Sequence, residues 1–226
     1  MKKLVLITGC ARSGTSMTAG VIGLCGGLGG DMFGPNKNNP KGMFENRIIR
    51  EGISKPYLRS IDADPMGQFP LPDMSLVKRD AENTDFVKKW RNMVLCALSS
   101  QIEESESVWF YKGAKMCLFW PLWHAAFPEA HWVLVQRSEQ GIIRSCMRTS
   151  FMKAHRTQEG WTGWVQEHKR RFSEMKKAGL NIKEVWPEKV VDGNLAEFRE
   201  MIDWLGMEFQ EEPIQEFIDP HLWRSK

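Results

Sequence analysis

A glycine-rich loop near the start of the chain carries the first residues whose types and spacing suggest chemistry. A predicted strand over residues 3–8 precedes it, the loop runs from Gly9 to Ser16, and an apolar run follows to Cys25. In this context the loop N–H groups point at an anion, and the positive end of the helix dipole adds to the attraction. We therefore predict a phosphate site formed by the loop residues Cys10, Ala11, Arg12, Ser13, Gly14, Thr15 and Ser16.

One position separates this loop from the loops that bind nucleoside triphosphates. Those loops read G-x-x-x-x-G-K-[ST]. Here Gly9 and Gly14 keep the spacing, but Thr15 stands in place of the lysine and Arg12 supplies a cation from within the loop. The sequence thus predicts that the loop binds a phosphate group, but ATP is not the ligand expected by default. The alternative is a strand-to-helix turn whose glycines serve only tight packing.

A second pair of residues suited to an anion follows a predicted strand over residues 131–137. Arg137 ends this strand, and open α/β sheets bind ligands at the carboxyl ends of their strands. Ser138 can cap the next helix, and Ser145 lies about two turns into it, with Gly141 one turn earlier on the same, uncovered face. An anion near the helix start can therefore contact Arg137 and Ser145 together. The alternative is an exposed arginine and a solvated serine.

The composition excludes several classes of protein. The 226 residues are 42% hydrophobic and 26% charged, with a net charge of +3, which predicts one globular domain over residues 1–226 and no nucleic-acid binding. No apolar run reaches the roughly 18 residues of a membrane helix, so we expect no membrane association. The five cysteines are scattered. With a strand starting at once at the N-terminus, this pattern predicts free thiols and a cytoplasmic location.

The other elements follow from apolar periodicity and from turn residues. A polar, glycine-rich loop is predicted over residues 26–42, and an irregular segment with three prolines over residues 59–80. We predict helices and one further buried strand in the rest of the chain: helices over residues 44–58, 85–104, 118–127, 157–178 and 197–205, and a strand over residues 108–112.

Taken together, these segments resemble the sulfotransferases that use 3′-phosphoadenosine 5′-phosphosulfate (PAPS). Residues 9–16 are similar to the family's loop for the 5′-phosphosulfate, and Arg137 with Ser145 to the pair that holds the 3′-phosphate. Residues 39–45, Asn-Pro-Lys-Gly-Met-Phe-Glu, resemble the N-P-K-G-[YF]-F-E segment of bacterial sulfotransferase-like proteins. Residues 217–222 resemble a common C-terminal ending of that group.

One segment departs from the family pattern. Residues 111–115, Tyr-Lys-Gly-Ala-Lys, fall where many members carry W-K-D-P-R. Gly113 and Ala114 replace the Asp-Pro pair, so the hydrogen bonds of that aspartate are absent.

The resemblance implies a three-layer P-loop-type α/β fold, with a mainly parallel central sheet flanked by helices. It also implies transfer of a sulfuryl group from PAPS to a hydroxyl or amine of a small-molecule or carbohydrate acceptor. Lys112 would neutralise charge on the bridging oxygen, and Glu45 would take the acceptor's proton. A carboxylate stabilised by a helix dipole is the alternative for Glu45. The sequence shows no Asp, Glu and His cluster with ligand spacing, so no metal is expected.

Two other functions fit parts of the sequence. A P-loop nucleotide or small-molecule kinase would use the same architecture, although the missing loop lysine and the lack of a plausible Mg²⁺ aspartate count against it. A nucleotide-binding module whose catalysis has decayed would explain the change at Gly113 and Ala114. The aromatic pair Trp161 and Trp164, which share a helix face, can form either core or the floor of an acceptor pocket.

Overall fold

The computed structural model describes residues 3–103 and 107–223, and in this part of the chain four strands form one central sheet. The spatial order is β2-β1-β3-β4, and every neighbouring pair is parallel. This arrangement confirms the predicted fold class. The strands are β1 (Lys3–Gly9), β2 (Val108–Lys112), β3 (His131–Val135) and β4 (Ile182–Val185).

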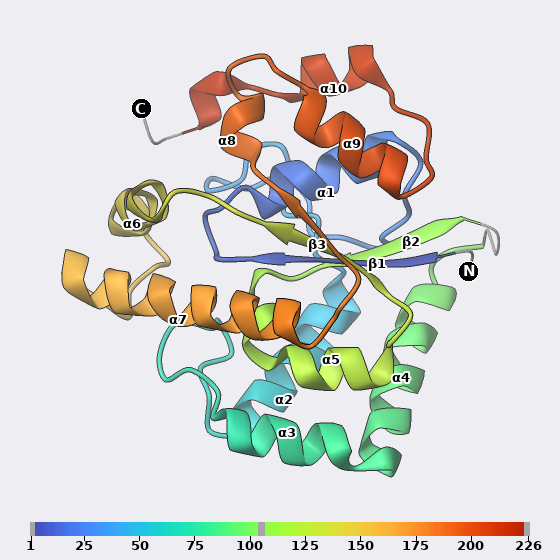
Figure 1. Cartoon of the computed structure of the whole chain (residues 1–226), viewed down its shortest axis with the longest axis vertical. Helices are drawn as coiled ribbons and strands as arrows, with labels where there is room; N and C mark the ends of the chain where they lie inside the picture. The colour runs from blue at the N-terminus through green and yellow to red at the C-terminus, as the bar shows by residue number, and fades with distance from the viewer. Residues whose placement is uncertain (1–2, 104–106, 224–226) are drawn as a thin grey trace.

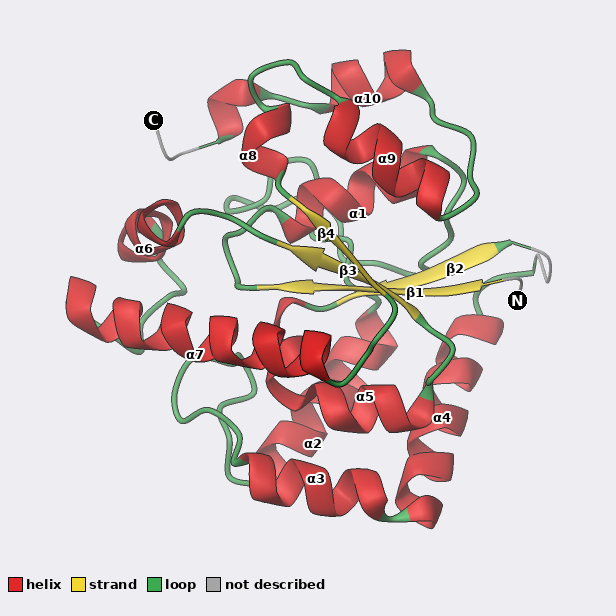
Figure 2. Cartoon of the chain, in the orientation of Figure 1, coloured by secondary structure: helices red, strands yellow, loops and turns green. Residues whose placement is uncertain are grey.

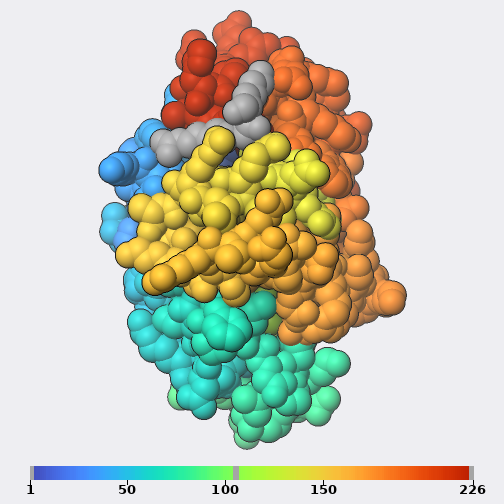
Figure 3. Space-filling view, turned by 90° about the vertical axis from the view of Figure 1, so that its left-hand side faces the viewer, coloured from blue at the N-terminus to red at the C-terminus, as the bar shows by residue number. Residues whose placement is uncertain are grey.

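The strand register brings three strand ends to one edge of the sheet. Ile7 pairs with Lys112, and Gly9 with Val135. The loop after β1, the turn after β2 and Arg137 just after β3 therefore leave the sheet on the same side, the left-hand side of Figure 2. Parallel α/β sheets bind ligands at such an edge. Figure 3 looks onto it, with the α6–α7 region in yellow and orange across the middle.

Helices cover both faces of the sheet and make the three layers (Figure 1). One face carries a mainly aliphatic core beneath α1 (Thr15–Leu24), α8 (Pro187–Val190), α9 (Ala196–Trp204) and α10 (Glu211–Phe217). The other face carries the π-helix η1 (Ile48–Ser54), α2 (Lys55–Ser60), α3 (Met74–Glu82), α4 (Thr84–Ser99), α5 (Trp120–Ala126) and α7 (Gln158–Lys177). At the carboxyl edge lie the 3₁₀ helices η2 (Ala114–Phe119) and η3 (Pro220–Leu222), with α6 (Glu139–Arg148).

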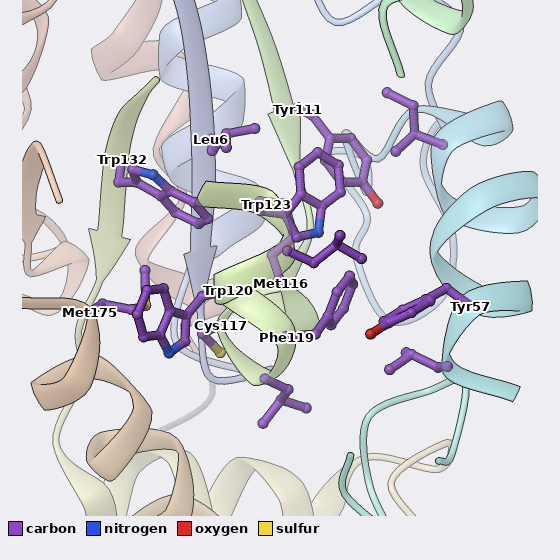
Figure 4. Close-up of a cluster of buried hydrophobic side chains, with 14 of the residues drawn as sticks. Leu6, Tyr57, Tyr111, Met116, Cys117, Phe119, Trp120, Trp123, Trp132 and Met175 are labelled. Carbon is purple, nitrogen blue, oxygen red and sulfur yellow. The ribbon is translucent and has the colours of Figure 1, made fainter. Parts of the chain in front are cut away.

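The core below the sheet is unusually aromatic. Figure 4 shows Tyr111 of β2 beside Trp123 of α5, whose rings stack with centroids 5.3 Å apart. Trp123 also meets Trp90 of α4 edge to face at 5.4 Å. Trp161 is fully buried in the same core. Much of the high tryptophan content therefore serves packing, because large rings bury much apolar area per side chain.

Several boundaries differ from the predicted ones. The segment predicted as irregular contains α3, which begins directly after its last proline because Asp73 caps it by accepting from the Ser75 N–H at 2.8 Å. The predicted helix 44–58 begins only at η1, and the helix 85–104 ends at Ser99, with Glu104 outside the described residues. The prediction did not contain β4, α8, α10 and η3.

The missing strand has a simple physical reason. β4 is a four-residue edge strand, and three of its side chains are only half-buried. Its sequence, Ile-Lys-Glu-Val, therefore lacks the continuous apolar run of β1 or β3.

None of the described helices combines the length and the hydrophobicity that a bilayer crossing requires.

Candidate active site

The loop after β1 turns sharply and leaves backbone donors open. Arg12 and Gly14 have left-handed conformations, with φ of 71° and 103°; the second is strained for a residue with a Cβ. Helix α1 starts at Thr15. No carbonyl or side chain of the described residues accepts from the N–H groups of Gly14, Thr15 and Ser16. These donors, at the positive end of α1, are available to an anion.

The structure places the predicted loop residues at different depths. Arg12, Gly14, Thr15 and Ser16 line a first cleft, and Ala11 lines a second, neighbouring cleft. Cys10 packs in the core, and Ser13 is fully buried, with no partner for its hydroxyl in the described chain. The side chains of Cys10 and Ser13 therefore line neither cleft, because the turn directs them inward.

Arg137 is the charged centre of the first cleft. It is only 4% exposed, and its Nη1 donates to the backbone oxygen of Arg12 at 2.6 Å. Its Nε and Nη2 are buried without a hydrogen-bond partner among the described residues. Burial lowers the pKa of Arg137 to about 10, against the opposing effect of Glu188, so the guanidinium stays charged at neutral pH. A buried cation with two unused donors is suited to an anion.

Ser145 and Arg12 complete this group. Arg12 donates from Nε to the Ser145 hydroxyl at 3.1 Å, which connects the loop to α6. A Cβ at Gly141 would lie 2.8 Å from Nε of Arg137 and 2.8 Å from the Ser138 hydroxyl. Only glycine therefore leaves room for the guanidinium here. The structure thus brings Arg137 and Ser145 together with the loop of residues 9–16, which was predicted to bind phosphate.

Aromatic side chains form other walls of the first cleft. The Arg137 guanidinium lies 4.2 Å from the ring centroid of Trp223. Phe44 and Phe217 meet edge to face, with centroids 6.0 Å apart. Residues 38–42 also line the cleft. Two segments that resemble the family, one before η1 and one at the C-terminal end of the described chain, therefore meet over the loop.

The second cleft holds the predicted catalytic pair. Lys112 donates from Nζ to Oε1 of Glu45 at 2.8 Å, and Nε of Arg50 lies 2.5 Å from Oε2 of Glu45. All three side chains are buried. Burial raises the pKa of Glu45, but the charges of Lys112, Lys115 and Arg50 outweigh burial and hold this pKa below its ordinary value. Glu45 is therefore ionised at neutral pH and is a weaker base than a free carboxylate.

Local backbone geometry points Glu45 inward. Phe44 has a left-handed conformation, with φ of 55°, directly before Glu45. The next residue, Asn46, accepts from the Ile49 N–H at 3.1 Å and donates to the Gly29 carbonyl at 3.0 Å. The Ser16 hydroxyl donates to the Met43 carbonyl at 3.3 Å. Glu45 is thus fixed from both sides, and the predicted first-turn carboxylate lies before the helix rather than in it.

The turn after Lys112 is held without the aspartate of the family pattern. The Gly113 N–H donates to the Ile7 carbonyl at 3.0 Å. The Thr8 hydroxyl lies 3.1 Å from the carbonyl oxygens of Gly113 and Ala114 and accepts from the Cys117 N–H at 3.0 Å. Thr8 of β1 therefore anchors the turn, and Lys112 keeps a defined position through Glu45.

Sequence reasoning missed three polar residues of the second cleft: Arg50, Lys115 and His168. His168 follows Trp164 by one helical turn, and its Nδ1 lies 2.8 Å from the Trp164 carbonyl, which assigns the proton to Nδ1. Burial lowers the pKa of His168 to about 4, so the ring is neutral and Nε2 keeps its lone pair. Lys115 ends the segment that was compared with W-K-D-P-R, but that comparison assigned it no role. No motif marks Arg50 of η1 or His168 of α7.

The two predicted alternatives for the tryptophan pair, core and pocket floor, apply to one residue each. Trp164 lines the second cleft, and its indole N–H donates to the Gly67 carbonyl at 3.0 Å. Trp161 is core, packed edge to face against Trp164 with centroids 5.4 Å apart.

The two clefts meet at the loop. Both are lined by Arg12, Thr15, Ser16, Asn38 and Asn39. A group bound at the loop can therefore be reached from the side of Arg137 and from the side of Glu45.

Within the described residues, no three His, Cys, Asp or Glu side chains gather as metal ligands would.

Comparisons with known proteins identify a similar domain and similar folds. A family model of the sulfotransferase domain matches residues 107–216, which include Lys112, Arg137 and Ser145. The parallel α/β fold and the match to the sulfotransferase domain together indicate a transferase. Over residues 107–216 the chain is thus similar to the sulfotransferase domain.

Solved structures show the same fold. The sulfotransferase STF1 from Mycobacterium tuberculosis H37Rv is 13% identical with a TM-score of 0.50, and the alignment covers 98% of this chain and 72% of that one. The sulfotransferase STF9 from Mycobacterium avium is 12% identical with a TM-score of 0.55, covering 96% of this chain and 67% of that one. No curated protein matches the chain.

Proposed function

We propose that this sulfotransferase takes its sulfuryl group from PAPS and transfers it to a hydroxyl or amine of a small acceptor. The observation that carries the proposal is Arg137, a buried guanidinium with two unused donors beside Ser145 and the phosphate loop. An ordinary 5′-nucleotide needs one phosphate site, whereas this cleft offers two separate groups of donors. A donor phosphorylated at both the 5′ and the 3′ position matches that number.

The residues fit such a donor as follows. The N–H groups of Gly14, Thr15 and Ser16 would hold the 5′-phosphate, with the dipole of α1 behind them. Arg137 and Ser145 would hold the 3′-phosphate, and Arg12, which contacts both, would stand between the two sites. Charge-assisted hydrogen bonds of this kind are about twice as strong as neutral ones.

When bound, the donor supplies a sulfuryl group joined to the 5′-phosphate through an anhydride oxygen. Lys112, at the end of β2, would stabilise the negative charge left on that oxygen. The second cleft would orient the acceptor. Glu45 would take the acceptor's proton, and in doing so would loosen its ion pair with Lys112. His168 is a second base candidate, because its buried ring is neutral with Nε2 unprotonated.

A binding titration followed by a transfer assay tests this proposal. Thermal shift and calorimetry would compare 3′-phosphoadenosine 5′-phosphate with adenosine 5′-phosphate and with ATP plus Mg²⁺. We expect the 3′-phosphorylated ligand to bind most tightly and without added metal. Stronger binding and turnover of ATP with Mg²⁺ would instead support a kinase.

Donor consumption with ³⁵S-labelled PAPS and a panel of hydroxyl and amine acceptors separates an active enzyme from a decayed binding module. Label transfer supports the proposal. Tight binding of the 3′-phosphorylated nucleotide with no transfer to any acceptor, and no slow hydrolysis of the donor, would support the decayed module.

A further inference from the structure

The second cleft carries more positive charge than its own side chains neutralise. One carboxylate, Glu45, is found among its described lining residues. The cations of the lining are Arg12, Lys37, Arg50, Lys112 and Lys115. Lys112 and Arg50 both pair with Glu45. The charge of the remaining cations therefore has no counterpart on the cleft wall.

Lys115 is the informative member of this group. Its side chain is about nine-tenths buried, yet no hydrogen-bond acceptor or carboxylate of residues 3–103 and 107–223 contacts its ammonium. Burial lowers the pKa of Lys115 to about 8, and the charge of Glu45 opposes this shift. A buried ammonium without a partner is unfavourable, and binding an anion removes the cost.

The backbone of Lys115 is fixed, so its position is a property of the fold. Lys115 is the second residue of η2, whose first turn is anchored to β1 through Thr8. A Cβ at Gly67 would lie 3.0 Å from Cβ of Lys115, so the neighbouring loop packs directly on the lysine stem. The packed stem therefore places the ammonium on the wall of the second cleft.

The position of Lys115 also separates it from the proposed 3′-phosphate site. It lines the second cleft and is absent from the lining of the first, to which Arg137 and Ser145 are confined, whereas Arg12, Thr15 and Ser16 line both. Apolar side chains share the second cleft with it: Met43, Met66, Phe151 and Trp164. The cleft thus combines an apolar wall with one unused buried cation.

We propose that the acceptor is an anionic compound, with a carboxylate or a phosphate ester on an apolar or aromatic body, and that Lys115 binds its anionic group. This inference rests on the proposed function, because it assigns the second cleft to the acceptor. Lys115 acts here as a specificity residue: it places the acceptor so that its hydroxyl or amine faces the loop.

Matched acceptor pairs test the inference. Each pair consists of a hydroxy acid and its uncharged amide, in aliphatic and phenolic forms, and a third arm replaces the carboxylate by a phosphate ester. The variant is Lys115→Met, which keeps the length and removes the charge. The control is Lys55→Met, which removes a nearby charge that lies outside the cleft lining and pairs with Glu51 at 2.7 Å.

For the unchanged protein we expect kcat/KM for the acid to exceed that for its amide by at least tenfold. Lys115→Met should lower kcat/KM for the acid at least about tenfold more than for the amide, which shares any change at Glu45, and should leave 3′-phosphoadenosine 5′-phosphate binding unchanged. Lys115→Arg should retain a preference for the acid. The phosphate arm shows which anion is preferred.

Equal losses for acid and amide in Lys115→Met would overturn the inference, because a lysine acting on the transferred group affects every acceptor. Calorimetric binding of acids and amides to the complex with 3′-phosphoadenosine 5′-phosphate gives a readout without turnover. Acids that bind no better than amides would also overturn it. Failure of the proposed function is recognised separately, since the 3′-phosphorylated nucleotide itself would then not bind.

Discussion

Lys112 and Glu45 lie 2.8 Å apart, although β2 and the segment before η1 are far apart in sequence. The contact joins the residue proposed to stabilise the leaving oxygen to the residue proposed to remove the acceptor proton. Because Arg50 pairs with the same carboxylate, Glu45 is at once the proposed base and the counter-charge for two buried cations. Mutations at Glu45 therefore affect stability and activity together, and the two effects need separate measurements.

Glu45→Gln should lower the free energy of unfolding by about 3 kcal/mol, because it leaves buried cations without their carboxylate. Adding Lys112→Met should recover part of this loss, so that the double variant is more stable than the sum of the single effects by at least about 1 kcal/mol. Urea denaturation of the four proteins measures this coupling. Asp31→Asn, which breaks an exposed pair with Arg47, is the matched control and should cost less than about 1 kcal/mol. Strict additivity of the Glu45 and Lys112 changes would contradict the coupling.

Arg137→Ala should weaken binding of 3′-phosphoadenosine 5′-phosphate by about 1.5–3 kcal/mol, the range of a charge-assisted hydrogen bond. Affinity for adenosine 5′-phosphate should change little, because that ligand lacks the 3′-phosphate. Calorimetry with both ligands measures the difference, and Arg148→Ala, at the exposed end of α6, controls for a general change in charge. Equal losses for the two ligands would remove the 3′-phosphate assignment from Arg137.

Arg12→Ala should weaken binding of both nucleotides, because Arg12 belongs to the loop proposed to hold the 5′-phosphate. It should weaken binding of the 3′-phosphorylated one more, because Arg12 also contacts Ser145. Thr15→Lys rebuilds the triphosphate motif but should not create ATPase activity, since no three His, Cys, Asp or Glu side chains of the described residues gather as metal ligands would. Phosphate release from ATP with Mg²⁺ checks the second expectation. An Arg12→Ala variant that binds both nucleotides normally would exclude Arg12 from the site.

Much of the fold could be predicted because its signals are local. The strands β1, β2 and β3 are continuous apolar runs, and Thr157 and Gly14 mark helix starts that the structure also has. The proximity of Arg137 and Ser145 could be predicted because both residues lie on one strand–helix unit, in which their spacing along the sequence fixes their relative position. Weakly patterned edge elements such as β4 carried no such signal.

The second cleft could be predicted only in part. Glu45 and Lys112 were predicted from short motifs that resemble the family, but their ion pair forms only when the segment before η1 folds onto the end of β2. Arg50, Lys115 and His168 come from three different elements and share a cleft only after folding. Cys10 and Ser13 were predicted from position in the loop, whereas the turn buries their side chains.

Lys115→Met should stabilise the protein at neutral pH while it harms transfer to anionic acceptors. The pKa of Lys115 is lowered from 10.5 to about 8, and at about 1.4 kcal/mol per unit this sets an upper limit of roughly 3 kcal/mol on the gain. The unfolded chain binds the proton up to a higher pH than the folded one, so the folded protein gains stability as the pH rises from about 8 toward 10.5. The advantage of Lys115→Met should therefore be largest below pH 8 and should shrink above it. Urea denaturation at pH 7 and pH 10 measures the two values, and a variant that is less stable than the parent at pH 7 would contradict a partnerless buried ammonium.

Glu45→Gln should reduce single-turnover sulfuryl transfer by about 10²–10⁴-fold, because the amide keeps the shape and loses the basicity. Donor affinity should survive, since Glu45 lines the second cleft and is absent from the lining of the first. His168→Gln is the matched comparison: it keeps a donor for the Trp164 carbonyl and removes the Nε2 lone pair.

The two variants also differ in their stability at acid pH, which separates folding from catalysis. Burial holds the pKa of His168 at about 4, below its ordinary 6.5, so the unfolded chain takes up this proton first and stability is lost as the pH falls from about 6.5 to 4. His168→Gln should remove that slope, whereas Glu45→Gln should leave it in place. If Glu45→Gln then transfers the sulfuryl group at a near-normal rate and His168→Gln is slowed at least a hundredfold at pH 7.5, where both variants are folded, the proton acceptor is His168 and Glu45 serves to hold Lys112.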